Sequence, residues 1–92
     1  MSDRDVNVGK EMILDQVKRE MRRRDLDPTL LVFKWDDQSA GVLALNVYRG
    51  QNREELMYSR VDVEDWPQKH GLAGKYLPRI LSAINKLLQE KP

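Results

Sequence analysis

The chain has 92 residues, enough for one domain, because domains usually contain on the order of 100 residues. Its residues are 40% hydrophobic and 34% charged, a composition typical of a folded domain with an ionic surface. The net charge is only +1, so the chain lacks the overall positive charge of many nucleic-acid-binding domains. It contains no cysteine, which excludes disulfides, thiolate nucleophiles and cysteine-ligated metal sites.

Residues 1–8 are mostly polar, so we expect them to form a flexible lead-in. A single domain is predicted over residues 9–92. A first helix is predicted from Gly9 to about Arg24, because apolar residues recur there at helical spacing on one face. Those residues are Ile13, Leu14, Val17 and Met21. The Asp-Leu-Asp-Pro sequence at 25–28 ends the helix, since proline cannot continue it and restricts the preceding residue.

Three short strands are predicted over residues 30–35, 42–49 and 54–63, separated by turn-forming residues. Their connections are too short for parallel crossovers, so the strands form an antiparallel meander. The sequence leaves the register of the third strand open. A loop of odd length after the second strand places Leu45 on the side of Met57, and one of even length places it on the side of Tyr58.

A second helix is predicted from about residue 74–77 to about Gln89, because Pro78 is tolerated only in the first turn. Its broad apolar face contains Tyr76, Leu77, Ile80, Leu81, Ile84, Leu87 and Leu88. A small three-stranded sheet needs helices on one face to bury enough apolar surface. The order therefore predicts an α+β fold, α-β-β-β-α, with both helices packed on one face of the meander.

This order of elements resembles the topology of the double-stranded RNA-binding domain, whose second helix opens with lysines that face phosphates. The corresponding region here has Lys75 and Arg79 rather than a lysine pair. The first turn between strands is acidic, with Asp36 and Asp37, where that family presents a polar loop. The resemblance covers topology only, and we assign the chain to no family.

The uncovered face of the predicted sheet is the leading candidate for a binding site. In the odd register it carries Lys34, Tyr48, Tyr58 and Arg60 together. Tyrosine and arginine are favoured anchors at protein interfaces, although ordinary cross-strand pairing also explains them. We therefore expect a small non-catalytic interaction or regulatory module that binds a protein, or a second copy of itself, through this face or an edge strand. Replacing Tyr48 and Tyr58 by serine should then abolish binding and leave the fold intact.

Nucleic-acid binding is the alternative hypothesis, because basic residues on the outer faces of the two helices could form one surface if the helices are neighbours. These residues are Lys18, Arg22, Arg23, Lys75, Arg79 and Lys86. Asp15 and Glu20 interrupt the basic run at the spacing of helical ion pairs, so a solvated, ion-paired helix is the simpler interpretation.

No residue pattern indicates an enzyme. His70 is the only histidine, and it lies in a loop without a neighbouring group that would hold it for proton transfer. We therefore expect no catalytic residue, no metal site and no cofactor. Apolar runs of at most four residues also exclude a signal peptide and a membrane span, so we expect a cytoplasmic protein.

Overall fold

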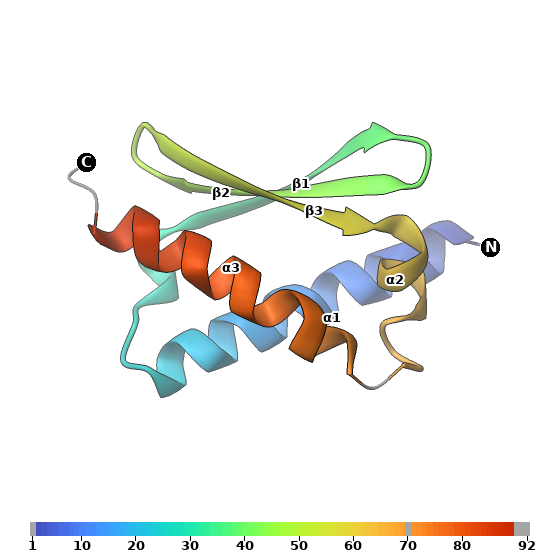
Figure 1. The fold of residues 1–92 in the computed structure, drawn as a ribbon, viewed down its shortest axis with the longest axis horizontal. Helices are drawn as coiled ribbons and strands as arrows, with labels where there is room; N and C mark the ends of the chain where they lie inside the picture. Colours follow the sequence, from blue (N-terminus) through green and yellow to red (C-terminus); the bar gives the residue numbers. More distant parts are fainter. Residues whose placement is uncertain (1, 70, 90–92) are drawn as a thin grey trace.

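The computed structural model describes residues 2–69 and 71–89, with side chains from residue 6 onward. The elements are α1 (Ser2–Arg23), the 3₁₀ turn η1 (Pro28–Leu30), β1 (Val32–Ser39), β2 (Val42–Arg49), β3 (Asn52–Ser59), α2 (Arg60–Asp65) and α3 (Leu72–Gln89). The strands form one antiparallel sheet in the order β1-β2-β3. Helices α1 and α3 lie together on one side of it, which confirms the predicted α+β architecture (Figure 1).

Helix α1 is longer than the sequence predicted. It begins at Ser2, so most of the predicted lead-in over residues 1–8 is helical and the boundary at Gly9 is wrong. The reason is Val6, which is only 3% exposed and lies two turns before Ile13, so it extends the same buried stripe. Met1 lies outside the described residues.

The predicted stop after α1 is confirmed. Asp25 takes a left-handed conformation with φ 61°. The N–H of Leu26 donates to the carbonyl of Met21 at 2.8 Å, and that of Asp25 to Arg22 at 3.1 Å. This bonding is the Schellman pattern of a helix C-terminus. Asp27 then accepts the Thr29 N–H at 2.9 Å and starts η1, which returns the chain toward the sheet.

The loop between β2 and β3 has an even number of residues, so the second of the two predicted registers is the one found. Two residues, Gly50 and Gln51, join β2 to β3, and Leu43 lies opposite Tyr58. Tyr58 therefore shares a face with the core residues of β2. The third strand also ends at Ser59 rather than at residue 63, because residues 60–65 form α2.

The first strand also differs from its prediction, since β1 runs over Val32–Ser39 rather than residues 30–35. The prediction ended the strand at Trp35 because the four residues that follow, 36–39, are polar. These polar residues are exposed in the structure, on a strand that pairs with β2 alone. An edge strand can carry exposed charges that a central strand would have to bury.

The core lies between the sheet and the helices. Its most buried members are Ile13, Val17 and Met21 of α1, Leu43, Leu45 and Val47 of β2, Val63 of α2, and Ile80, Ile84 and Leu87 of α3. The opposite face of the sheet has no described segment over it. The helices therefore supply all the layer packing and leave one face and the β1 edge open.

Candidate functional site

The four residues predicted to share the uncovered face do not form one surface. Lys34 and Tyr48 lie on that face, since both pair in register with residues that point away from the helices. Tyr58 lies on the helix-covered face and is 1% exposed, and Arg60 is the first residue of α2. The prediction that they share a face is wrong because it required a loop of odd length.

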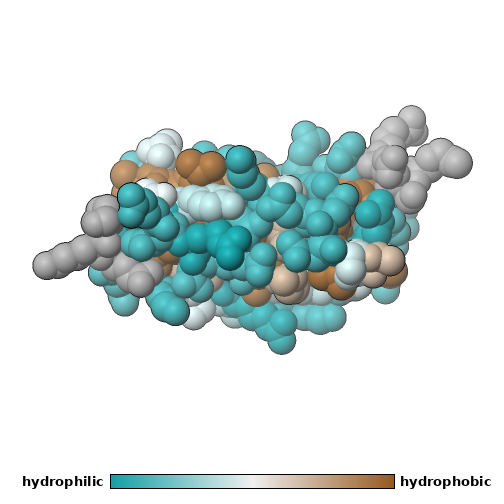
Figure 2. Space-filling model, turned by 90° about the horizontal axis from the view of Figure 1, so that it is seen from above, coloured by the Kyte–Doolittle hydropathy of each residue, from teal (hydrophilic) through white to brown (hydrophobic). Residues whose placement is uncertain are grey.

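The uncovered face is polar at its centre, as Figure 2 shows from above the sheet. Its charged side chains are Lys34 and Asp36 of β1, and Arg53 and Glu55 of β3. The exposed apolar residues Val32 and Met57 lie on opposite edge strands. In the middle, Asn46 is buried and donates through Nδ2 to Asp36 Oδ2 at 2.5 Å. This face therefore lacks the continuous apolar patch expected of a strong docking surface.

The six basic residues of the alternative hypothesis do not form one surface either. Lys75 pairs with Asp62 of α2 at 3.2 Å, and Lys86 pairs with Glu54 of β3 at 3.5 Å. Arg23 pairs with Glu20 of its own helix, and Arg79 is exposed on α3. Lys18 and Arg22 instead line a groove beside β1. Lys18 and Arg22 are thus separated from Lys75 and Lys86, which pair on the side of α2 and β3.

Ion pairs along α1 follow the spacing predicted from the sequence. Arg19 pairs with Asp15, and Glu20 accepts from Arg23 and Arg24, each at 2.9 Å. Hydrogen bonds from these two arginines, that of Arg23 first, lower the pKa of Glu20 to about 2.

Lys18 and Arg22 remain without a carboxylate partner among the described residues. The sequence does not show this, because Asp15 lies three positions before Lys18, at ion-pair spacing, but its carboxylate pairs with Arg19 in the structure. Both side chains line one open groove of about 260 Å³ between α1 and the start of β1.

Apolar side chains form much of the remaining groove wall. The residues that line it with the two cations are Leu14, Pro28, Thr29, Leu31 and Phe33. Lys18 Nζ lies 5.6 Å from the centre of the Phe33 ring, a cation–π contact that places the charge over the strand. The groove therefore combines an apolar surface with two available positive charges. Sequence reasoning missed these wall residues because η1 and α1 meet only in the folded chain.

The groove adjoins the start of the β1 edge, where Phe33 lines it. Because β1 pairs only with β2, the backbone N–H and C=O groups on its outer side have no strand beside them. Its first half is regular, and a register irregularity occurs only between Asp37 and Ser39. The site therefore offers a regular strand edge next to a groove that can receive side chains.

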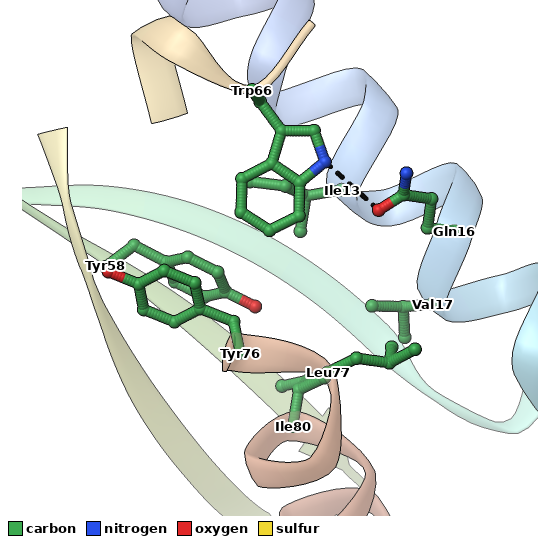
Figure 3. A pocket seen from close by; sticks show the side chains of 8 residues that line it. All are labelled: Ile13, Gln16, Val17, Tyr58, Trp66, Tyr76, Leu77 and Ile80. Atoms are coloured by element: carbon green, nitrogen blue, oxygen red, sulfur yellow. Dashed lines mark hydrogen bonds between the residues drawn. The ribbon is translucent and has the colours of Figure 1, made fainter. Parts of the chain in front are cut away.

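A second concavity contains aromatic residues from three elements (Figure 3). The rings of Tyr58 and Tyr76 stack with centroids 4.5 Å apart. Trp66 donates from Nε1 to Gln16 Oε1 at 3.0 Å. The crevice has no space for a water molecule, so we interpret it as packed core rather than as a ligand site.

The two stacked tyrosines differ in how their hydroxyls are bonded. Tyr76 donates to Asp62 Oδ2 at 2.6 Å and accepts the Ser59 N–H at 3.3 Å. The bond from Tyr76 lowers the pKa of the Asp62 carboxyl. The Tyr58 hydroxyl is buried without a partner in the described part of the chain, and burial raises its pKa.

Because the two hydroxyls are bonded differently, removing each of them should change stability differently. We expect Tyr76→Phe to lower the free energy of unfolding by about 1–2 kcal/mol, because it removes the hydrogen bond to Asp62 and leaves the Ser59 N–H without its acceptor. Tyr58→Phe should be neutral or stabilising, since it removes a hydroxyl whose burial costs desolvation free energy that no hydrogen bond offsets. Urea unfolding followed by tryptophan fluorescence measures both. Equal losses in the two variants would contradict the bonding described here.

Within residues 2–69 and 71–89, no three potential metal ligands cluster, and no helix is long and apolar enough to cross a bilayer. His70 lies outside this described part. No protein-family model matches the chain, and searches of curated proteins and of solved structures also find no match. The groove and the β1 edge are therefore the features that indicate a function.

Proposed function

We propose that this chain is a non-catalytic protein-interaction module that binds an extended protein segment along the edge of β1. The observation that carries the proposal is the groove beside that edge, with Lys18 and Arg22 unpaired at its wall. In strand addition, backbone hydrogen bonds supply affinity, and pockets beside the strand select side chains.

The geometry of an added strand defines what the groove would select. Successive side chains of a strand point to opposite faces, so every second residue of the bound segment points toward α1. Those residues meet the apolar surface of Leu14, Leu31 and Phe33, and the charges of Lys18 and Arg22. A segment that presents apolar and acidic residues on this side matches the site, because a carboxylate would neutralise the unpaired cations.

Nucleic-acid binding has less support than this proposal. A duplex or single strand is bound by several cations that follow its phosphates. Lys75 and Lys86 are engaged with carboxylates on the side of β3, away from the groove. The two cations of the groove are next to an apolar wall, which suits a protein segment better than a phosphate backbone.

The proposal is tested by selecting binders from a library of random peptides displayed on phage, with the wild-type chain as the target. We expect acidic peptides whose binding shifts the backbone amide NMR signals of residues 31–35. Arg22→Glu should weaken their binding by at least about tenfold, because like charges then meet in the groove. Arg79→Glu is the matched control, since it makes the same charge change on an exposed position of α3.

Selected peptides that bind both variants equally, or that shift amides away from β1, would overturn the proposal. So would a library from which the wild-type chain selects nothing although the chain is monomeric at the concentration used. Fluorescence polarisation with synthetic copies of the selected peptides gives the affinities.

A further inference from the structure

We infer that the segment bound at the β1 edge is β1 of a second copy of this chain, paired antiparallel about a twofold axis. This inference rests on the proposed function and names its partner. Two three-stranded sheets would join into one six-stranded sheet, with the helices of both copies on the same side. The order of charges along β1 favours this pairing.

The charges of β1 are divided between its two halves. Lys34 is in the first half, beside the groove that holds Lys18 and Arg22, and Asp36 and Asp37 are in the second half. An antiparallel copy places the second half of one strand against the first half of the other. A twofold interface must be complementary to itself, and this distribution of charge meets that condition.

The strand also specifies a register. Facing residues in an antiparallel pair must point to the same face of the sheet, so the axis passes through a residue position. An axis at Lys34, Asp36 or Asp37 sets that residue against its own copy, and directly opposed like charges are destabilising. An axis at Trp35 sets Lys34 against Asp36 of the second copy, and this pair occurs twice.

An axis at Phe33 is the remaining choice with substantial overlap. It sets Lys34 against Val32 of the second copy, and both aspartates lie beyond the paired residues. It therefore forms no pair of opposite charges across the strands. The register centred on Trp35 is the one that uses the charges of both halves of β1.

The same register brings an acid to the groove. With the axis at Trp35, Asp37 of the second copy lies opposite Phe33. Phe33 and Asp37 both point to the helix side, since they pair with Val47 and Leu43 of the core. Lys18 Nζ already lies 5.6 Å from the centre of the Phe33 ring. The second copy thus contributes a carboxylate to the groove that the single chain leaves without one.

Aromatic residues lie at the centre of this interface. Trp35 is half-buried and contacts Tyr58 edge-on, with ring centroids 5.2 Å apart. In the proposed register the backbones of the two Trp35 residues meet at the axis, and each indole leans inward against Tyr58 of its own chain. The indoles therefore support the paired strands from the core side and do not contact each other.

Charge exchange on β1 tests the inference. Sedimentation velocity and native mass spectrometry measure the oligomeric state from about 1 µM to about 1 mM protein. We expect a wild-type dimer, and at least about tenfold weaker self-association for Lys34→Glu and for Asp36→Lys alone, because like charges then face each other. The two variants mixed in equal amounts should form a heterodimer, because each supplies the charge that the other lacks. The double variant should again form a homodimer.

Matched controls lie on the same face at the opposite edge of the sheet. Arg53→Glu and Glu55→Lys make the same charge changes on β3, which the proposed interface does not contain. Both should dimerise like the wild type. Amide hydrogen exchange on the wild type is independent of any variant, and protection of residues 32–36 should increase with protein concentration.

A wild-type chain that stays monomeric at about 1 mM would overturn the inference that a second copy binds at β1. The proposed function would then be tested by the peptide selection alone. A dimer that is insensitive to the β1 exchanges, or that Arg53→Glu disrupts, would overturn the interface and its register. The absence of both a dimer and a β1-binding peptide would remove the proposed function as well. The results therefore distinguish a failure of the second-copy inference from a failure of the proposed function.

Discussion

Gly9→Ala is expected to destabilise the fold by about 3 kcal/mol, although alanine ordinarily favours a helix over glycine by about 1 kcal/mol. A β-carbon built at Gly9 lies 1.9 Å from the carbonyl oxygen of Val63 and 2.9 Å from its carbon. These are backbone atoms of α2, so the clash cannot be relieved by turning a side chain. Either α1 or α2 must move, and both carry buried core residues.

Guanidinium denaturation followed by circular dichroism measures the change for Gly9→Ala. The matched control is Gly74→Ala in α3, because a β-carbon there meets no atom within 4 Å. We expect this control to gain about 0.5–1 kcal/mol from its lower conformational entropy in the unfolded chain. A Gly9→Ala protein as stable as the wild type would show that α1 and α2 do not cross as described.

Tyr58→Ser is expected to cost about 3–5 kcal/mol, the usual loss when a large buried aromatic side chain is truncated. Tyr58 is 1% exposed and contacts the rings of Trp35, Trp66 and Tyr76. Truncation leaves a cavity between the sheet and α3 that these rings cannot fill. The expectation that serine at this position leaves the fold intact is therefore wrong.

Tyr48→Ser provides the comparison on the opposite face of the same sheet. Tyr48 is half-buried and points away from the core, so we expect a loss of less than about 1 kcal/mol. Thermal unfolding and urea titration of both variants give the two values. Similar losses at the two positions would contradict the register of β3. A loss of partner binding in Tyr58→Ser alone would report unfolding rather than an interface.

Local chemistry explains the parts of the fold that could be predicted. The apolar stripes of α1 and α3 identify helices because a helix repeats every 3.6 residues whatever its surroundings. Asp25 and Pro28 end α1 through their own backbone preferences. The candidate site was only partly visible in this way. An edge strand was one of the predicted binding surfaces, and Lys18 and Arg22 belonged to the predicted basic residues, but nothing local related them to Phe33.

The end of the third strand was predicted wrongly because the alternation of residues continues past it. The alternation from residue 54 to 63 is real, yet it crosses from β3 into α2 at Arg60. Val63 is buried in α2 against α1, where Gly9 permits the close approach. A periodicity of two does not exclude a short helix when one apolar residue is all that the helix must bury.

Local sequence is enough to predict the two long helices, the three strands between them and the buried side of each long helix, because these depend on residues near one another in the chain. It did not reveal α2, which was predicted as the end of the third strand. The folding of the whole chain places Tyr58 in the core and leaves Lys18 and Arg22 unpaired beside β1. Strand register depends on the backbone path of a two-residue turn, and one residue more or less inverts every side chain after it. Ion pairs such as Lys86 with Glu54 join positions far apart in sequence, so proximity in space settles which charges remain available.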